Sequence, residues 1–501
     1  MNKLARLDHK FVWHPFTQMR DWLKSEPIVI IEGKGAELRD VRGRKFLDAN
    51  SSIWTNLHGH NHPKINSGIS RQLKKIAHSS ALGFANEPAS LLAEKLVKSA
   101  ECGIRNAESK KIKRGVKIPC SAPYLDKVFF SDDGSTALEV ALKLAYEFSR
   151  RKNKIKNPKF LSLDGAYHGD TVGAVSLGHI DLFYKAYGGL LFKSDKVMSP
   201  YCYRCPFNRA KPERDDARNY RKCNWECVGQ FEQKFSAQKK KGNPFAAFVF
   251  EPLMQGAAGM IPQPRGWLKQ VSQIAQSYGA LLIADEVMTG FGRTGVQSSE
   301  FKVQSLGNVE RQTLNAKLFA CQQENVQPDF LCLAKGLTGG YLPMAATLTT
   351  QKVFDAFLGG YHEFKTFFHG HSYTGNQLGA SAALASLEIL ESKQSIRARQ
   401  TLEKSFREEL KLLWQLPNVG DVRQVGLIAG IELVKNWRTR EAFDLRERAG
   451  IRVCDEMAKR GVLTRPIGNV IVLMPPYCTT PSQLKKMVAA THESIVEIFG
   501  K

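Results

Sequence analysis

The sequence predicts an α/β fold whose large domain is built on a mostly parallel sheet. Three observations support this prediction. Short, almost wholly apolar segments recur between about residues 125 and 335, helix-length segments separate them, and two of the apolar segments end in a charged residue. Strands that are apolar throughout are buried on both faces, as in a parallel sheet flanked by helices.

The expected elements fall into three parts along the chain. Near the start, short strands are expected at 28–31 and 36–40, before a turn at 42–44. The central part carries strands at 128–130, 160–163, 247–250, 281–284 and 330–334, with a helix at about 135–150. Beyond residue 377, long amphipathic helices precede strands at 422–433 and 470–474. We therefore expect a large domain (76–376) and a smaller α+β domain built from both chain ends (1–75 and 377–501).

Three segments look like insertions between these elements: 103–124, 201–241 and 300–316. The second contains four cysteines in two closely spaced pairs, Cys202-x-x-Cys205 and Cys223-x-x-x-Cys227. Paired cysteines of this kind occur in structural zinc sites, but the second spacing is unusual for one. We favour free or packed thiols and expect no metal, with zinc and disulfides as the alternatives.

Composition is that of an ordinary globular protein, with 43% hydrophobic and 24% charged residues. A net charge of +24 suggests nucleic-acid binding, but most of the excess lies in four short polar segments (104–117, 150–159, 209–222 and 239–241) without a recognisable nucleic-acid-binding motif. No apolar run approaches the roughly 20 residues that cross a membrane, and the start lacks an apolar signal segment. We expect a cytoplasmic enzyme with reduced cysteines, binding neither nucleic acid nor membrane.

Two strand-end residues point to pyridoxal phosphate (PLP). Lys335 follows the apolar run 330–334 and precedes a glycine-rich turn. Burial lowers the pKa of a lysine there and frees its amine for a Schiff base, whereas an isolated lysine more often extends into solvent. Asp285 ends the strand at 281–284, where a carboxylate can hold a protonated pyridine nitrogen. Together they predict a PLP site.

Further motifs supply candidates for the same site. Gly134-Ser135 begins the expected helix at 135–150, where free N–H groups and the helix dipole attract a phosphate; a plain N-cap is the alternative. Tyr167, on a strand-end loop, can stack on a flat ring, although a buried tyrosine is more often simple core. The alternating histidines His58, His60 and His62 lack a carboxylate partner and are weak evidence for a metal.

Five motifs follow one another along the chain: Gly134-Ser135, Tyr167-His168-Gly169-Asp170, Asp285-Glu286, Gly290 to Gly295 and Lys335-Gly336. Their order resembles that of the class III, fold-type I PLP aminotransferases, and the resemblance covers nearly the whole chain apart from the insertions. It implies that Lys335 carries the cofactor and moves the substrate proton. It also implies that Asp285 pairs with the pyridine nitrogen and that Tyr167 stacks on the ring, while Gly134 and Ser135 hold the phosphate.

Within class III, other stretches resemble the aminotransferases of biotin synthesis: His14 to Met19, Ser51 to Trp54, Leu57 to Pro63, Phe367 to Asn376 and Leu463 to Gly468. This implies a homodimer in which Ser372 of one chain assists the phosphate site of the other. It also implies substrate contacts by Trp54, Asp170 and Gly370, with Arg465 receiving the carboxylate of 7-keto-8-aminopelargonate.

The amino donor stays open between S-adenosylmethionine and lysine. Members that use S-adenosylmethionine often have tyrosines where this chain has Phe16 and Val472. S-adenosylmethionine is the commoner donor in the family, whereas some members use lysine. The remaining alternatives are another class III ω-amino acid aminotransferase and, outside enzymes of this kind, a PLP-containing nucleic-acid-binding regulator.

Overall fold

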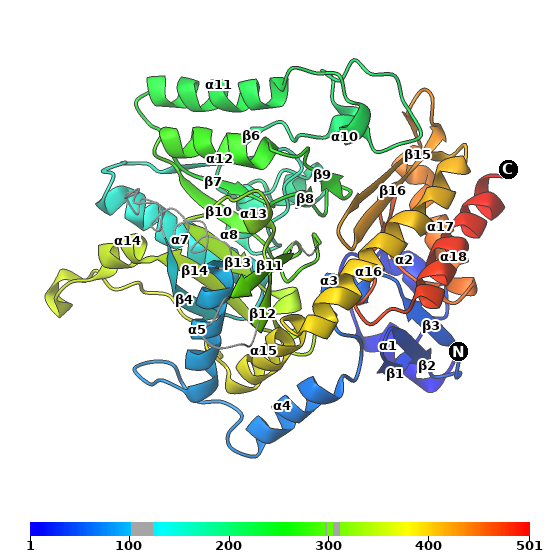
Figure 1. Ribbon diagram of the computed structural model, residues 1–501, viewed down its shortest axis with the longest axis horizontal. Helices are drawn as coiled ribbons and strands as arrows, with labels where there is room; N and C mark the ends of the chain where they lie inside the picture. Colours follow the sequence, from blue (N-terminus) through cyan, green and yellow to red (C-terminus); the bar gives the residue numbers. More distant parts are fainter. Residues whose placement is uncertain (102–123, 296–297, 304–310, 501) are drawn as a thin grey trace.

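A seven-stranded sheet forms the centre of the large domain in the computed structural model, which describes residues 1–101, 124–295, 298–303 and 311–500 (Figure 1). In spatial order its strands are β4 (Leu125–Ser131), β14 (Ala345–Thr350), β13 (Phe330–Leu333), β10 (Leu281–Asp285), β7 (Phe245–Phe250), β5 (Lys159–Leu163) and β6 (Asp195–Val197). Only β14 runs antiparallel to its neighbours. The predicted mostly parallel sheet is confirmed.

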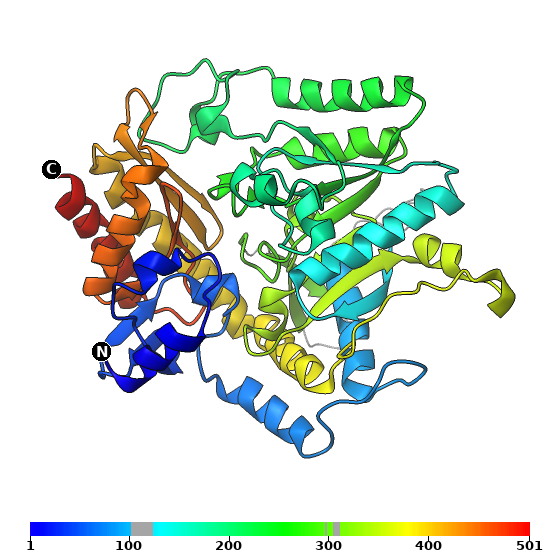
Figure 2. The same cartoon turned by 180° about the vertical axis from the view of Figure 1, so that it is seen from behind.

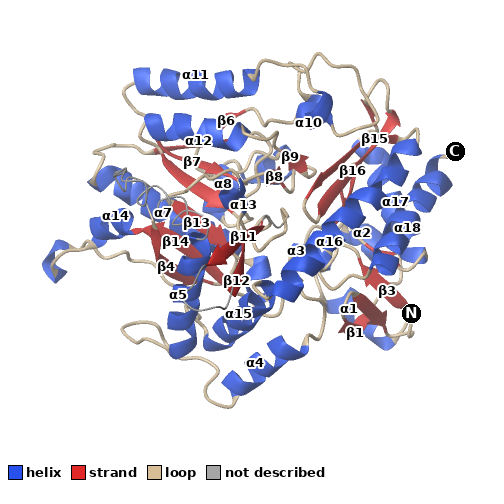
Figure 3. Cartoon of the chain, in the orientation of Figure 1, coloured by secondary structure: helices blue, strands red, loops and turns tan. Residues whose placement is uncertain are grey.

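Helices cover both faces of this sheet. Alternate residues of β10 face opposite sides: Leu281 and Ile283 pack with residues of α7 (Gly134–Arg151), whereas Leu282 and Ala284 belong to the core that includes Trp267 of α12 (Trp267–Ser277). Helix α11 (Glu226–Lys240) lies alongside α12 (Figure 3). Burial on both faces explains why these strands are apolar throughout.

The smaller domain joins the two ends of the chain, as the two termini lying on the same side of the molecule show (Figure 2). One sheet contains β1 (Ile30–Lys34), β2 (Glu37–Asp40), β3 (Lys45–Asp48) and, parallel to β3, the late strand β18 (Val462–Leu463). A second sheet contains β15 (Val419–Val425), β16 (Ile428–Asn436), β20 (Val470–Leu473), β19 (Pro466–Ile467) and the side strand β17 (Glu441–Ala442). The prediction of an α+β unit built from both ends is confirmed.

Shorter elements connect these layers. Among the described residues, the remaining α-helices are α1 (Lys3–Phe11), α2 (Met19–Trp22), α3 (Ser51–Trp54), α4 (Pro63–Leu73), α5 (Glu87–Glu101), α8 (Val172–Leu177), α9 (Asp181–Tyr184), α10 (Ala217–Tyr220), α13 (Ala320–Gln323), α14 (Gln351–Phe354), α15 (Gln377–Leu390), α16 (Lys393–Leu410), α17 (Ala449–Lys459) and α18 (Pro481–Phe499). Two hairpins are formed by β8 (Met254–Gln255) with β9 (Ile261–Pro262) and by β11 (Ser298–Val303) with β12 (Arg311–Ala316). Among the helices that the structure describes, none has the length and apolar character needed to span a bilayer.

Two expectations need correction. The single strand predicted at 422–433 is a hairpin of β15 and β16, because Gly426 adopts a φ of 59° at the turn between them. The segment 201–241 is not merely an inserted loop, since α11 buries Cys227, Phe231 and Phe235 against the large domain. The predicted insertion 103–124 falls, except for its last residue, outside the described residues, and so does the middle of 300–316.

Candidate active site

A cavity of about 400 Å³ lies where the chain leaves the carboxyl ends of β4, β5, β7, β10 and β13. The carboxyl edge of a parallel sheet is the usual position of a ligand site in α/β proteins. Six residues singled out in the sequence line this cavity together: Trp54, Gly134, Ser135, Tyr167, Asp285 and Lys335. The volume is within the range of small-molecule sites, which is roughly 300–1,000 Å³.

Lys335 follows strand β13 after one intervening residue, Ala334, and lines the cavity. Its backbone has a φ of 41°, a conformation that non-glycine residues adopt only where their surroundings enforce it. Burial lowers the pKa of Lys335, although Asp285 and Glu251 oppose this shift. The amine lies 4.5 Å from the centre of the Trp54 ring, and no ion pair of Lys335 is present among the described residues. An unpaired amine of lowered pKa is suited to covalent attachment of a carbonyl group.

Asp285 is held at the end of β10 by a neighbour that our sequence interpretation missed. One carboxylate oxygen lies 2.8 Å from Nδ1 of the buried His168, and the other accepts the Val287 N–H at 3.1 Å. His168 follows Tyr167 directly in the motif, but its contact with Asp285 spans 117 residues and no local pattern predicts it. The imidazole fixes the carboxylate toward the cavity.

The start of α7 presents the groups that a phosphate needs. The N-cap Asp133 accepts the Thr136 N–H at 2.9 Å, which leaves the N–H groups of Gly134 and Ser135 without helical acceptors. A Cβ at Gly134 would lie 2.7 Å from Cγ1 of Val287, so the close approach of these segments requires glycine. Free amides at the positive end of an 18-residue helix form an anion site.

Tyr167 is fixed by two acids, one of which sequence reasoning also missed. Its hydroxyl donates to Asp170 at 2.6 Å, and its N–H donates to Glu251 at 3.3 Å. Burial raises the pKa of the Tyr167 hydroxyl, and the contact with Asp170 raises it further. Glu251 follows the buried strand β7, and burial raises its pKa to about 7. Its position at a strand end is the signal that could have identified it.

Trp54 reaches the cavity on a left-handed turn. Ser51, Ser52, Ile53 and Trp54 have consecutive φ values of 47°, 46°, 65° and 69°. Such backbone costs roughly 1–2 kcal/mol per residue for L-amino acids. The turn is held by Ser51 Oγ, which donates to the Met474 carbonyl at 2.6 Å, and by Asp48, which accepts the Ser52 N–H at 2.9 Å. Strained backbone of this kind is concentrated at functional sites.

Four predicted site residues do not line this cavity. Asp170 is exposed and reaches the site only through its hydrogen bond with the Tyr167 hydroxyl. Arg465 is exposed, and its guanidinium donates to the Phe16 carbonyl at 3.4 Å. Gly370 and Ser372 are exposed on the segment after α14, where the Ser372 carbonyl lies 2.8 Å from Nε2 of His78. A single chain therefore assembles the part of the site that contains Lys335 and Asp285. Arg465, Gly370 and Ser372 lie at its surface.

The histidine and cysteine motifs have structural partners. His58 lies 2.9 Å from Ser386 Oγ, and His60 lies 3.0 Å from Asp48. Burial lowers the pKa of His58 to about 3, which keeps its ring neutral. Within the described parts of the chain, no three His, Cys, Asp or Glu side chains are grouped as a metal ion requires. The four cysteines of the 201–241 segment are Cys202, Cys205, Cys223 and Cys227, and all carry free thiols.

These residues fit PLP. The cavity offers an unpaired lysine amine, a buried carboxylate oriented by His168, and free amides at the start of α7. These three groups match the aldehyde, the pyridine nitrogen and the phosphate of the cofactor, respectively.

Comparison with known proteins agrees with this geometry. The family "Aminotransferase class-III" matches residues 19–301 and 315–495. The "Adenosylmethionine-8-amino-7-oxononanoate aminotransferase" of Geobacter sulfurreducens is 43% identical over 493 residues, covering 98% of this chain and 97% of that protein. The crystal structure of the same-named protein from Methanocaldococcus jannaschii has a TM-score of 0.83 at 38% identity, covering 99% of this chain and 98% of the other. A PLP-bound amine transaminase from an uncultivated Pseudomonas species has a TM-score of 0.79 at 30% identity, with 97% and 98% coverage.

Proposed function

The chain belongs to the class III aminotransferases, and on this premise we propose that it converts 7-keto-8-aminopelargonate (8-amino-7-oxononanoate) to 7,8-diaminopelargonate in biotin synthesis, with S-adenosylmethionine as amino donor. The enzyme is a PLP-dependent transaminase. The observation that carries the proposed substrate is the near-full-length similarity to relatives named for this reaction, in a chain whose cavity combines Lys335, Asp285 and Trp54.

We assign the residues of the cavity as follows. When bound, PLP withdraws electrons from the substrate carbon that loses its proton. The Lys335 amine attaches the cofactor and afterwards holds and returns that proton, which its lowered pKa favours. Asp285, oriented by His168, keeps the pyridine nitrogen protonated, and the α7 amides of Gly134 and Ser135 bind the phosphate. Tyr167 packs on the ring.

Arg465 is the arginine that we assign to the substrate carboxylate. Arg423, another arginine of the smaller domain, is fully buried and already pairs with Asp421 at 3.0 Å and Glu432 at 2.6 Å. The charge of Arg423 is thus compensated by two carboxylates, whereas Arg465 is exposed and donates to the Phe16 carbonyl at 3.4 Å, with no ion pair among the described residues. Its planar fork suits bidentate binding of a carboxylate.

We further propose a homodimer. The segment after α14 exposes several large apolar side chains, which a monomer would leave in water, and it also carries Ser372. The exposed residues are Leu358, Tyr361, Phe364, Phe368 and Tyr373. In the dimer, Ser372 of each chain would complete the phosphate site of the other. We place the enzyme in the cytoplasm, where the free thiols of Cys202, Cys205 and the other described cysteines match a reducing compartment.

Lysine is the second candidate donor, favoured by two apolar positions. Phe16 lies at the surface with its ring 5.3 Å from that of Phe183, and Val472 is fully buried among Met254, Met260 and their neighbours. Neither side chain can donate a hydrogen bond to the donor's polar groups. Lysine, as an amino donor that makes fewer polar contacts with the protein, is compatible with these two apolar positions.

A single-turnover absorbance experiment tests the proposal. The purified PLP form is mixed separately with S-adenosylmethionine, lysine, ornithine or β-alanine, and the band of the lysine-bound cofactor is followed. Loss of the band with S-adenosylmethionine, and its return on adding the keto acid, is the expected result. Loss with lysine alone identifies the second donor. Conversion only by ornithine or β-alanine would overturn the biotin assignment.

A further inference from the structure

A buried ionic cluster connects the 201–241 segment to the smaller domain. Its centre is Arg423 on β15, which is 0% exposed and pairs through Nη1 with Asp421 and with Glu432 on β16. Glu432 also accepts hydrogen bonds from Tyr201 Oη and, at 2.6 Å, from Arg204 Nε. Two arginines thus balance two carboxylates, with Tyr201 as an additional donor. We name these five residues the Arg423 cluster.

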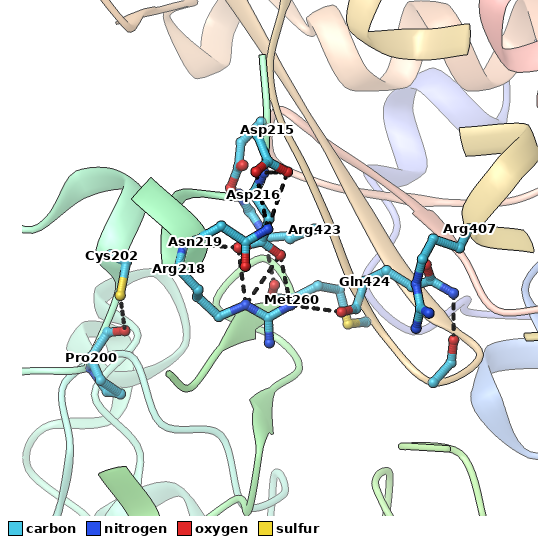
Figure 4. A network of polar contacts seen from close by, with 12 residues as sticks. Pro200, Cys202, Asp215, Asp216, Arg218, Asn219, Met260, Arg407, Arg423 and Gln424 are labelled. Carbon is cyan, nitrogen blue, oxygen red and sulfur yellow. Dashed lines mark hydrogen bonds and ion pairs between the residues drawn. The ribbon is translucent and has the colours of Figure 1, made fainter. Parts of the chain in front are cut away.

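The other side of the Arg423 guanidinium holds a strained turn. Nε donates to the Met260 carbonyl at 2.8 Å, and Nη2 donates to the Gly259 carbonyl at 2.5 Å. Figure 4 draws Arg423 and Met260 within the surrounding network of polar contacts. Met260 and Gly259 have positive φ values of 53° and 109°. Hydrogen bonds from a charged donor are stronger than those between neutral groups, and these bonds hold Met260 in its left-handed conformation. Without Arg423, the two buried carbonyls would lose their donors.

The turn at 256–260 also forms part of the cavity wall. The Gly256 N–H donates to Glu251 at 2.7 Å, and the same carboxylate accepts the Tyr167 N–H. A Cβ at Gly256 would lie 2.7 Å from Met288 Sδ and 3.4 Å from the Trp54 ring, so the turn packs closely against the substrate side of the cavity. A continuous series of contacts therefore links Tyr201 at one end to Trp54 and Tyr167 at the other.

We propose that Arg423 is a positioning residue for the substrate side of the cavity, and that the 201–241 segment, through Tyr201 and Arg204, is part of the frame of the active site. The cluster clamps the Gly259–Met260 turn, and this turn fixes Trp54, Met288 and Glu251. A buried ion pair is a weak source of net stability, but the loss of one partner leaves an uncompensated buried charge and is strongly unfavourable. A shift of about 1 Å in positioning groups can cost on the order of 100-fold in rate.

Three variants of the dimeric holoenzyme separate positioning from stability. Arg423→Lys keeps the charge that Asp421 and Glu432 need but cannot donate to both turn carbonyls. Tyr201→Phe removes one hydroxyl from the cluster, far from the substrate. Arg214→Met is the matched control, because Arg214 ties the same segment to β15, through the Val419 carbonyl at 2.7 Å, without contacting the cluster.

We expect kcat/KM for the keto acid to fall at least tenfold in Arg423→Lys and about threefold in Tyr201→Phe, and to stay within twofold of the parent in Arg214→Met. The visible absorbance and circular dichroism of the bound cofactor should stay unchanged in all three. The proposal is overturned if Arg423→Lys keeps kcat/KM within twofold of the parent but lowers Tm, because this result would mean that Arg423 has a purely structural role. The proposal is overturned as well if kcat/KM falls as much in Arg214→Met as in Tyr201→Phe.

A third result would also overturn the proposal: a large rise in KM for Arg423→Lys alone, with Tyr201→Phe unaffected, would mean that Arg423 binds substrate directly. The choice of the keto acid rests on the proposed function. If the parent enzyme fails to turn over the keto acid, the proposed function fails, and the same variants are compared by single-turnover loss of the cofactor band with whichever donor converts the parent.

Discussion

The two sides of the active-site cavity are built in different ways. On the cofactor side, Asp285 ends strand β10, Gly134 begins helix α7, and Lys335 follows strand β13 after Ala334, so strands and a helix bring all three residues to the cavity. On the substrate side, Trp54 is carried by a left-handed turn and supported by a second turn that contains Met260, also at positive φ. Regular elements hold their side chains through backbone hydrogen bonds, whereas these turns depend on specific side-chain anchors. The cofactor side should therefore be the more robust to changes elsewhere in the chain.

The largest effect is expected from Lys335→Ala. Removal of the amine should lower turnover by more than about 1,000-fold and abolish the absorbance band of the lysine-bound cofactor, because attachment and proton transfer both need this group. Absorbance spectra and multiple-turnover assays check this. If Lys335→Ala keeps both the absorbance band and multiple turnover, another amine attaches the cofactor. Lys352→Ala, at a lysine outside the cavity lining, is the control.

Arg465→Ala probes the substrate side, and a smaller loss is expected. Loss of a charge-assisted carboxylate contact costs about 1.5–3 kcal/mol, which corresponds to a KM for the keto acid higher by roughly 10- to 150-fold. The cofactor band should be unchanged. Arg448→Ala, which removes an exposed arginine paired with Asp21, is the control. An unchanged KM in Arg465→Ala would place the carboxylate elsewhere and leave the substrate side without an assigned cation.

A pH-dependent contribution to stability is expected from Glu286, next to Asp285 on the cofactor side. Burial raises its pKa from 4.5 to about 7, although its carboxylate accepts the N–H groups of Ala320 and Cys321. The folded protein binds this proton more tightly than the unfolded chain. Its contribution is therefore fully present below pH 4.5 and is lost as the pH rises through about 7.

Between pH 5 and 8 this loss should be on the order of 1–3 kcal/mol of unfolding free energy. Urea unfolding of the parent and of Glu286→Gln at several pH values measures it. The variant is expected to be less stable overall but to show a flatter pH dependence. Glu388→Gln, at an exposed glutamate paired with Lys64, should keep the slope of the parent. If the unfolding free energy changes equally with pH in the parent and in Glu286→Gln, Glu286 is not the source of the pH dependence.

The smallest effect concerns the strain on the substrate side. Ile53 is 49% exposed with a φ of 65°, so Ile53→Gly should relieve backbone strain and raise the unfolding free energy by up to about 1 kcal/mol. Ile451→Gly is the matched control, since Ile451 is 39% exposed but lies in the right-handed helix α17. There the same change should destabilise by about 1 kcal/mol. Destabilisation at both positions would show that the left-handed turn carries no strain.

Sequence reasoning succeeded where structure is local. The strand ends at Asp285 and Lys335, and the helix start at Gly134, follow from apolar runs and a glycine, which are visible within a few residues. The same reasoning predicted one strand over 422–433 because it gave no weight to Gly426. In the structure this glycine adopts a positive φ at the turn between two strands. It treated α11 as part of an insertion because the lysines at its end obscured the helical spacing of Cys227, Phe231 and Phe235.

The contacts that could not be predicted are those between distant segments. His168 reaches Asp285, and Glu251 joins Tyr167 to Gly256, only after the parallel strands are placed side by side. The left-handed turn at 51–54 contains no glycine or asparagine of its own, so propensity predicts the wrong backbone there. Its role was inferred from family resemblance alone.

The pairing of β3 with β18 has a consequence for the order of biosynthesis. Leu47 pairs with Val462, so one edge of the amino-terminal sheet lacks its neighbour until about 400 further residues have been translated. At roughly 5–20 residues per second, that interval lasts on the order of 20–80 s. Until then the nascent chain exposes an unpaired strand edge, which is a template for edge-to-edge association. Chains that terminate before β18 would keep that edge open and should be cleared by proteolysis.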